Sequence, residues 1–305
     1  MSASTKRTAG LALALLGGVS LASQSRINGE LGSRLGDGVA AALVSFGSGF
    51  VVLAAAAIAL PAGRRGVKAL GDALSVHKLR WWQCVGGVSG GYFVAMQGLT
   101  VSMIGLAVFT VAAISGQVGS SLLVDRAGLG PGGPRPVTAT RLVAAALAVV
   151  AVVVAVADRV GSPGALGLAA LPAVGGVAVA WQQAMNGRVQ AAAGAQTATF
   201  LNFSMGFLTL VIVYSVLGPL RGLPSRWPAE WWLYTGGLLG ILFVLASVVV
   251  VRTVGVLMLG LGSIAGQVLA SLAFDVIVPA SGDHLAANTV AGALLMLLAV
   301  AVAAR

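Results

Sequence analysis

The sequence contains little charge. Only 9% of its 305 residues are Asp, Glu, Lys or Arg, whereas a soluble globular chain has about 25%. Hydrophobic residues make up 58%. A folded soluble protein of this size keeps a large exterior and could not hide so much apolar surface. The composition therefore excludes a soluble enzyme, a secreted domain and a disordered regulator, and it predicts a polytopic membrane protein.

Cysteine and histidine are almost absent. The one cysteine, Cys84, can form no disulfide within the chain and cannot by itself build a zinc site. The two histidines, His77 and His284, both lie near predicted loops. The sequence also has no Gly-x4-Gly-Lys-Ser/Thr motif, which would cradle the phosphates of ATP. We therefore expect no metal, no cofactor and no ATP hydrolysis by this chain.

Acidic residues are also few, with 8 Asp and Glu against 18 Lys and Arg and a formal net charge of +10. On a soluble domain this charge could indicate nucleic acid, but here the basic residues lie mostly between apolar runs. Cytoplasmic loops of membrane proteins retain Lys and Arg, so we interpret the charge as topological and expect no nucleic acid partner. Lys6 and Arg7 before an apolar run also resemble a signal peptide. The internal repeat described below argues against that interpretation, because a segment in the middle of the chain matches this one.

Ten apolar runs are long enough to cross a bilayer as helices, since a span needs about 20 residues. The longest polar connection is Pro61–Arg80, and the next is Arg126–Pro136. With the N-terminus inside, most basic residues fall on the inner side, so we expect both termini in the cytoplasm. The expected fold is an all-α integral membrane protein with ten transmembrane helices, at 9–30, 38–60, 81–101, 105–125, 139–157, 164–187, 196–217, 231–251, 254–277 and 286–304.

The chain contains an internal repeat. Trp81–Val94 matches Trp231–Val244 at seven of fourteen positions. Each half holds five predicted spans, and because five is odd, the second half enters the membrane from the opposite side. Two inverted five-helix repeats are the architecture of many secondary transporters. We assign residues 1–137 to the first four helices of repeat one, 138–160 to its fifth helix and 161–305 to the inverted second repeat. Shorter blocks also match, namely Gln24 and Asn28 with Gln182 and Asn186, Ser45–Phe50 with Asn202–Phe207, Gly116–Val118 with Gly266–Val268, and Asp125 with Asp275.

These blocks give a family resemblance over nearly the whole chain. The Gln-x3-Asn motif, the Trp-Trp…Gly-Gly-x2-Gly block and the Gly-Gln-x3-Ser-Leu-x2-Asp block resemble the drug/metabolite transporter superfamily, and within it the inner-membrane exporters called YdcZ-like. The resemblance implies a location in the bacterial inner membrane, ten helices, cytoplasmic termini and a central cavity lined by both halves, but no particular substrate. That branch often places His after the first Asp, whereas Arg126 follows Asp125 here. A role of that His therefore does not carry over.

Polar side chains recur at four-residue spacing on four of the predicted spans, which places each set on one helix face. Such groups lack water in lipid and must face protein or a wet cavity. Gln117 and Gln267 fall about halfway along their spans, so we expect them near the bilayer midplane, where substrate binds in repeat transporters. The alternative is that the amides only join neighbouring helices. The candidate cavity residues are Gln117, Gln267, Gln24, Asn28, Gln182, Asn186, Ser121, Ser263 and Ser271.

The acidic residues all fall in loops or in the end turns of the predicted helices. Proton-coupled exporters commonly use a carboxylate or histidine embedded in the membrane, so we expect transport that is uncoupled or coupled through Glu30, Asp125 or Asp275. Capping or loop anchoring is an equal alternative for the two aspartates. Arg26 and Glu30 are four residues apart, and we expect them to form an interfacial ion pair.

Two function classes compete with a transporter. The segment Gly87–Gly90 matches the short nucleophile motif of intramembrane serine proteases, but neither histidine lies within a span to act as the base, so we expect no enzyme. A channel-like or scaffold protein is the alternative, although charged rings and a filter loop are missing from the sequence. We expect an exporter of a small polar or amphipathic metabolite that works by alternating access, with the lipid bilayer as its surroundings and a homodimer as a candidate assembly.

Overall fold

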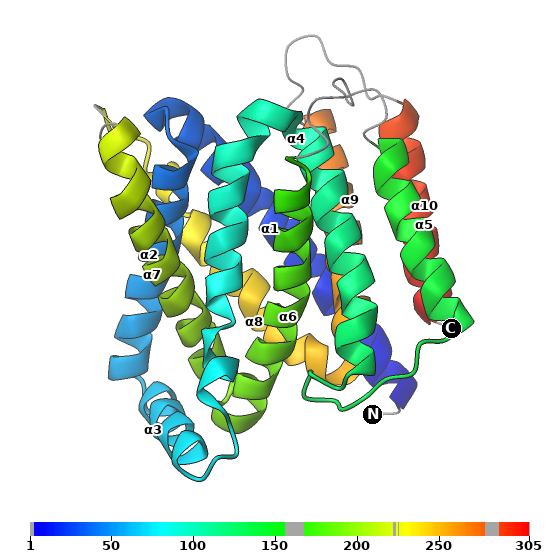
Figure 1. The fold of residues 1–305 in the computed structure, drawn as a ribbon, viewed down its shortest axis with the longest axis horizontal. Helices are drawn as coiled ribbons and strands as arrows, with labels where there is room; N and C mark the ends of the chain where they lie inside the picture. Colours follow the sequence, from blue (N-terminus) through cyan, green and yellow to red (C-terminus); the bar gives the residue numbers. More distant parts are fainter. Residues whose placement is uncertain (1–2, 156–167, 222–223, 225, 278–286, 305) are drawn as a thin grey trace.

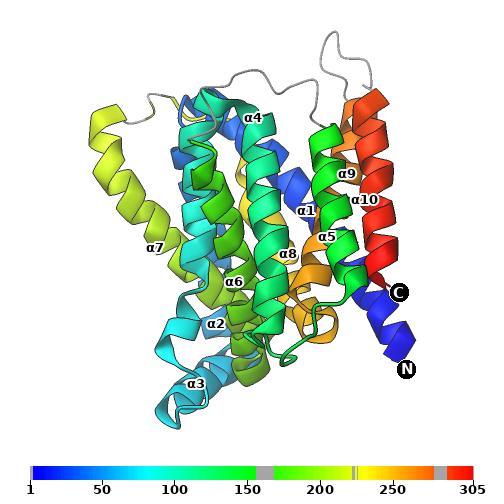
Figure 2. The ribbon, with the colours of Figure 1, turned by 45° about the vertical axis from the view of Figure 1, so that its right-hand side comes forward.

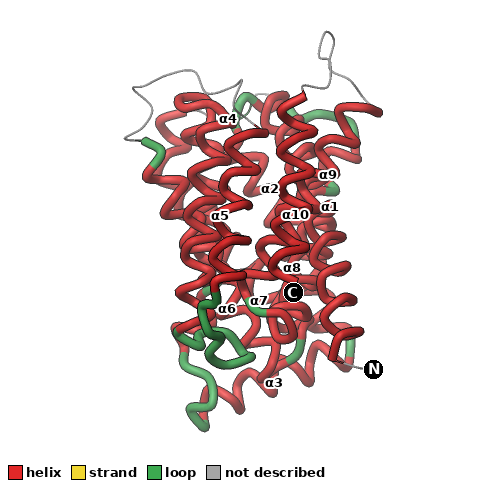
Figure 3. The backbone as a smooth tube through the Cα atoms, turned by 90° about the vertical axis from the view of Figure 1, so that its right-hand side faces the viewer, coloured by secondary structure: helices red, strands yellow, loops and turns green. Residues whose placement is uncertain are grey.

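The computed structural model describes the chain except residues 1–2, 156–167, 222–223, 225, 278–286 and 305, and the described part is helical without strands. Its helices form a bundle (Figure 1), and the described loops gather at the two ends (Figure 3). The elements are α1 (Ala3–Leu35), α2 (Gly38–Ala59), α3 (Pro61–Ser75), η1 (Trp81–Val85), α4 (Gly87–Arg126), α5 (Ala139–Ala155), α6 (Ala170–Ala193), α7 (Ala195–Arg221), η4 (Trp231–Tyr234), α8 (Gly236–Val254), α9 (Val256–Ile277) and α10 (Ala287–Ala304).

Several of the helices suit a membrane. Among the described residues, four segments are long and apolar enough to cross one: Arg7–Leu35, Gly38–Ala59, Ala195–Val216 and Trp231–Val254. Helix α1 has 33 residues and is about 50 Å long, which exceeds the roughly 30 Å of bilayer hydrocarbon. It runs obliquely through the bundle (Figure 1). Large apolar side chains are exposed on many helices, as is expected of a surface that meets lipid.

Helix α4 joins two predicted spans. We expected separate helices at 81–101 and 105–125, but helical turns continue from Gly87 to Arg126. In Figure 1 the α4 ribbon rises, crosses over at one end of the bundle and descends. The short stretch between the two expected helices, Ser102–Ile104, contains neither Gly nor Pro to end a helix. The expected start at Trp81 is also different, because Trp81–Val85 forms a 3-10 turn before α4.

The expectation of a polar connection at Pro61–Arg80 was incomplete, because most of it forms helix α3. Pro61 occupies the first turn of α3, where a proline is well tolerated. Gly63, Gly66 and Ala73 are buried on one face, and a β-carbon on Gly66 would overlap the Thr197 hydroxyl. Helix α3 therefore lies across the end of the bundle and packs against α2, α6 and α7 (Figure 2).

Helices α2 and α7 meet through repeated phenylalanines. The rings of Phe46 and Phe203 lie 5.2 Å apart between centroids, and Phe50 stacks on Phe207 at 5.4 Å. Side chains at Gly49 and Gly206 would overlap Phe203 and Phe46, respectively. The repeat matches Phe46, Gly49 and Phe50 with Phe203, Gly206 and Phe207. Each helix therefore contributes a phenylalanine ring that packs on a glycine of the other helix. This reciprocity explains the block at Ser45–Phe50 and Asn202–Phe207.

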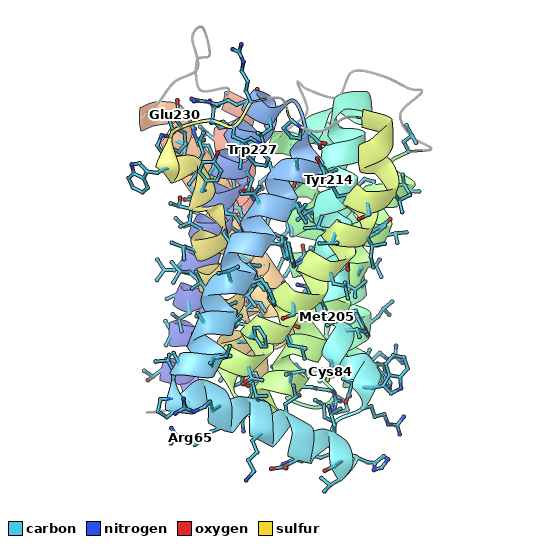
Figure 4. The ribbon with its side chains drawn as sticks, turned by 90° about the vertical axis from the view of Figure 1, so that its left-hand side faces the viewer. Arg65, Cys84, Met205, Tyr214, Trp227 and Glu230 are labelled. Atoms are coloured by element: carbon cyan, nitrogen blue, oxygen red, sulfur yellow. The ribbon has the colours of Figure 1, made fainter. Side chains whose placement is uncertain are left out.

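Helices α5 and α10 pack against each other at one edge of the bundle (Figures 1 and 2). Buried alanines on both helices, including Ala144, Ala148 and Ala299, allow this close approach. Both chain ends lie towards the same end of the bundle as α3 (Figure 1). Figure 4 places Arg65 and Cys84 at that end, and Trp227 and Glu230 at the other.

Candidate functional site

The first cluster of amides joins α1 to α2. Gln24 and Asn28 share one face of α1, and both donate to the hydroxyl oxygen of Ser45, from Nε2 at 3.3 Å and from Nδ2 at 3.2 Å. Gln24 and Ser45 are buried. This cluster lies against α8, because a β-carbon on Gly236 would overlap the Asn28 side chain and one on Gly240 would lie 2.5 Å from Gln24 Nε2.

The second cluster repeats this arrangement between α6 and α7. Gln182 Nε2 and Asn186 Nδ2 each donate to Asn202 Oδ1 at 2.8 Å, and all three side chains are buried. The glycines here lie at the start of α4. A β-carbon on Gly86 would be 2.9 Å from Asn186 Oδ1, and one on Gly90 would be 3.1 Å from Gln182 Nε2.

The two clusters are therefore reciprocal. The amides of the first half pack on glycines of the second half, and the amides of the second half pack on glycines of the first half. The structure brings Gln24 together with Asn28, and Gln182 with Asn186, and each of these four amide nitrogens donates one hydrogen bond to a neighbouring helix. One acceptor in each cluster, Asn28 Oδ1 and Gln182 Oε1, is buried and has no partner among the described residues.

Gln117 and Gln267 lie at two further reciprocal contacts, where helices of opposite halves cross through glycine. On α1 and α9, a side chain at Gly18 would overlap the Ser263 carbonyl, and one at Gly266 would overlap the backbone of Leu15. Gln267 lies next to this crossing, and its Nε2 donates to the Ser263 carbonyl at 3.3 Å.

The matching crossing joins α6 to α4. A side chain at Gly176 would overlap the Ala113 carbonyl, and one at Gly116 would overlap the Ala173 carbonyl. Gln117 follows Gly116 and points towards α9, where a β-carbon on Gly260 would lie 3.6 Å from its Nε2. Gln117 and Gln267 are both half-buried, and each lies beside a close contact between the two halves.

The candidate serines have different surroundings. Ser121 is buried, and its hydroxyl donates to the Gln117 carbonyl at 2.6 Å. Ser263 is buried too, but its hydroxyl has no hydrogen-bond partner among the described residues. Ser271 belongs to α9, but its side chain lies outside the part of the chain that the structure describes.

Gln183 is a buried amide that the sequence analysis did not single out. It is 6% exposed, and neither Nε2 nor Oε1 has a hydrogen-bond partner among the described residues. It lies on the face of α6 that carries Gly176 and Gly187, which pack on α4 and on α8. A spacing of four residues does not single out Gln183, because no polar residue lies four positions before or after it, and its match in the repeat is Ser25, which is exposed.

Asp125 is a structural cap as well as a candidate for coupling. It is 3% exposed, forms an ion pair with Arg141, and accepts from the backbone N–H groups of Val256 at 2.9 Å and Leu257 at 3.2 Å. The Asp125 carboxylate therefore caps the N-terminus of α9, where a negative charge is favoured. Helix α9 begins directly after Gly255, which has a positive φ of 86°.

The loop after α4 is held against the second half by arginines. Arg135 donates to the Thr253 carbonyl at 2.9 Å, and Arg188 donates to the carbonyl oxygens of Gly128 (2.7 Å) and Leu129. Burial lowers the pKa of the Arg135 guanidinium, although the charge of Asp125 opposes this shift. These hydrogen bonds join the two halves at this end of the bundle.

The expected ion pair between Arg26 and Glu30 was wrong. Glu30 pairs with Arg34 at 2.7 Å, and Arg34 also reaches Glu230 at 2.5 Å. Arg26 lies over the ring of Phe274, 5.3 Å from its centroid. The backbone N–H of Glu230 and the guanidinium of Arg34 hold the pKa of the Glu230 carboxyl below its ordinary value.

The third coupling candidate, Asp275, has its side chain outside the described part of the chain. Within the described residues, no group of three or more His, Cys, Asp or Glu side chains could hold a metal ion.

Comparison with known proteins identifies a family. The model of the family described as "Putative inner membrane exporter, YdcZ" matches twice, at residues 9–154 and 167–302. No curated protein matches the chain. Nine chains of solved structures match it. One of them, described only as the crystal structure of a protein, is 21% identical over 99% of this chain and 97% of its own, with a TM-score of 0.68. At that identity the likeness concerns the fold alone.

Proposed function

Because the chain belongs to the YdcZ family of inner-membrane exporters, in a form with two repeats, we propose that it is a secondary transporter that exports a small polar or amphipathic metabolite by alternating access. The observation that carries this proposal beyond the family is the reciprocity of the contacts between the halves. At both amide clusters, the amides of one half pack on glycines of the other, and at both crossings a glycine of each half packs on the backbone of the other. At α2–α7, the matching Phe and Gly residues of the two halves pack against each other.

In this proposal the chain spans the membrane ten times as two inverted repeats, at residues 1–160 and 161–305. The segments that follow α2 and α7 support this architecture, because they occupy corresponding places in the two repeats and lie at opposite ends of the bundle (Figure 4). The segment after α2 contains helix α3, and the segment after α7 contains Trp227 and Glu230. The excess of basic residues puts the α3 end and both termini in the cytoplasm.

The contacts between the halves suit a rocking motion. Glycine crossings place backbone against backbone, so that two helices can pivot without moving large side chains. In inverted-repeat transporters alternating access is largely the rocking of one repeat against the other around a fixed site. Because Asp125, Arg135 and Arg188 join the two halves at the α3 end, opening towards the cytoplasm requires those contacts to break.

We place substrate beside the two crossings, against Gln117 and Gln267, with Gln183 as a further polar group. The support is that Gln117 and Gln267 are half-buried next to the contacts between halves, and that neither polar atom of Gln183 has a hydrogen-bond partner in the described part of the chain. The other amides, Gln24 with Asn28 and Gln182 with Asn186, serve mainly to join helices. Neutral amides favour a neutral, zwitterionic or weakly anionic substrate over a cation.

The experiment is a ligand screen followed by transport. Purified protein is heated with single neutral, zwitterionic and anionic metabolites, and those that raise the melting temperature are tested for counterflow in proteoliposomes. We expect Gln117→Leu to remove both the stabilisation and the counterflow while the protein stays monodisperse. Ser204→Ala is the control, because the Ser204 hydroxyl donates to the Phe200 carbonyl of its own helix. If Gln117→Leu fails to fold, the side chain joins helices and does not bind substrate.

Coupling is proposed to be absent or to use the acids at helix ends, Glu30, Asp125 and Asp275. Of these, Glu30 is exposed and Asp125 is buried under Arg141, so a proton relay through Asp125 requires that ion pair to open. Proteoliposomes with an imposed pH gradient test this with the variant Glu30→Gln, Asp125→Asn, Asp275→Asn. Accumulation driven by protons that survives all three substitutions would place the relay elsewhere. Native mass spectrometry of the same preparation tests the homodimer.

A further inference from the structure

Helix α3 differs from the rest of the bundle in direction and in charge. It lies across the end of the other helices (Figures 1 and 4) and is seated there by Gly63 and Gly66, which have no side chain to hold it off. A β-carbon on Gly66 would lie 2.9 Å from the Ala193 carbonyl at the end of α6. The orientation of α3 is therefore fixed by packing, and one side of it remains outside.

That outer side is basic. Five side chains on α3 and in the segment after it are exposed, and within the described residues none of them takes part in an ion pair. Asp72 is the only acidic residue in this stretch of the sequence. The five are Arg64, Arg65, Lys68, Lys78 and Arg80.

Apolar side chains are exposed beside these charges. Val67 on α3 and Leu60 just before it are about half exposed, and Val76 and Trp81 are 70% and 75% exposed. Soluble anions and acidic proteins would leave these groups in water, whereas a lipid head group region accepts both the charges and the apolar groups. Tryptophan is also enriched at the boundary between membrane and water.

We propose that α3 and residues 76–81 form a binding surface for anionic phospholipids, in which Arg65, Lys68 and Lys78 bind the lipid phosphates, and Val67 and Trp81 enter the interface. Basic residues close to a membrane are attracted to anionic head groups. Since α3 follows α2 directly and packs on α6 and α7, a bound lipid contacts an element that joins both halves. The surface does not depend on the transported substrate.

The test compares two charge-removing variants. Arg65→Gln with Lys68→Gln removes two charges from α3, and Arg64 is left alone because it donates to the Ile58 carbonyl. Arg126→Gln with Arg252→Gln removes two exposed charges from the last turns of α4 and α8, at the same end of the bundle. Purified proteins in detergent are titrated with phosphatidylglycerol and with phosphatidylcholine of the same chain length, and bound lipid is counted by native mass spectrometry.

We expect the unsubstituted chain and the Arg126/Arg252 control to prefer phosphatidylglycerol, and the Arg65/Lys68 variant to bind it about tenfold more weakly or worse. High salt should weaken the preference in the same way. Equal loss in both variants, or no loss in the α3 variant, would overturn the proposal. Displacement of phosphatidylglycerol by inorganic phosphate at equal concentration would also overturn it, because the site would then serve a soluble anion.

Discussion

The buried amides depend on glycines that are remote in sequence. Gln24 and Asn28 are accommodated because Gly236 and Gly240 offer no side chain, and the second cluster is accommodated by Gly86 and Gly90 in the same way. The polar motif of one half therefore packs directly on the glycine motif of the other half. At this scale, a single added methyl group or a single lost hydrogen-bond acceptor changes the stability of the contact.

Asn202 gives the most direct test of the second cluster. Asn202→Leu removes the acceptor shared by Gln182 and Asn186 and leaves two buried donors without a bond. Hydrogen bonds between helices in membranes contribute about 0.6 kcal/mol on average and up to about 1.7, so we expect a loss of about 1–3 kcal/mol in the free energy of unfolding. Ser204→Ala on the same helix should cost much less, and equal losses would mean that the cluster does not stabilise the protein.

Substitution of Gln183 by an apolar residue should raise the stability of the protein, whereas substitution of Asn202 lowers it. An unpaired buried polar group costs about 1–3 kcal/mol, so Gln183→Met, which keeps the length of the side chain, should raise the stability of the ligand-free protein and reduce transport. Gln83 is the control, because it is buried and accepts from the Arg80 backbone N–H at 2.8 Å. Gln83→Met should therefore destabilise. A Gln183→Met protein that is less stable than the parent would mean that the amide is satisfied in solution.

The ion pair at the far end of the bundle gives a pH dependence. Since the pKa of Glu230 is lower in the folded chain than its ordinary value of 4.5, the unfolded chain binds more protons as the pH falls. The stabilising contribution is complete above about pH 4.5 and is lost below it. We expect Glu230→Gln to make the acid-induced loss of stability slightly shallower, and the effect to be small because the pair is exposed. An unchanged acid titration would contradict the pair.

At the scale of helices, the crossings of α1 with α9 and of α6 with α4 are the contacts on which the proposed motion depends. Each is made by two glycines, one from each helix, so the backbones approach more closely than any side chain would allow. A helix usually loses stability from internal glycine, and the repeat of these positions in both halves is consistent with a packing requirement that outweighs that loss.

Two glycines on α4 separate packing from helix propensity. A side chain at Gly116 would overlap the Ala173 carbonyl, whereas nothing lies within 4 Å of a β-carbon on Gly119. We expect Gly119→Ala to stabilise by up to about 1 kcal/mol with transport unchanged. Gly116→Ala should destabilise by about 1–3 kcal/mol and reduce transport. Unfolding curves and counterflow of the two variants provide the comparison, and similar behaviour would show that the crossing tolerates separation.

Some elements could be predicted from the sequence and others could not. The apolar runs predict most helices because their length is sufficient to cross a bilayer, but the sequence predicts only a polar connection at α3, because the buried face of that helix consists of small residues. Glu30 lies four residues from both Arg26 and Arg34, and spacing alone cannot choose between them. The choice falls on Arg34, which also reaches Glu230 in the other half.

The candidate site shows the same limit. The repeat identified matching positions, but it could not tell that the amides of one half lie against the glycines of the other, because matching relates like with like. Ser45 and Asn202 occupy the same place with different chemistry, a hydroxyl in one cluster and an amide in the other. Their shared role as acceptor follows from the hydrogen bonds and not from the residue types.

At the scale of the whole molecule, the account rests on an exporter built from two halves that enter the membrane in opposite directions. The family describes inner-membrane exporters, and its model matches each half of this chain. If the halves are inverted, the segment after α2 and the segment after α7 must lie on opposite sides of the membrane, although they occupy equivalent places in the repeat.

Labelling of those two segments measures this directly. In a Cys84→Ser background, Lys68→Cys places a thiol on α3 and Arg226→Cys places one before η4, and both positions are exposed. Intact cells are treated with a thiol reagent that cannot cross the inner membrane, and then permeabilised cells are treated in the same way. The account predicts labelling at position 226 in intact cells and at position 68 only after permeabilisation. Labelling of both positions from the same side would contradict it.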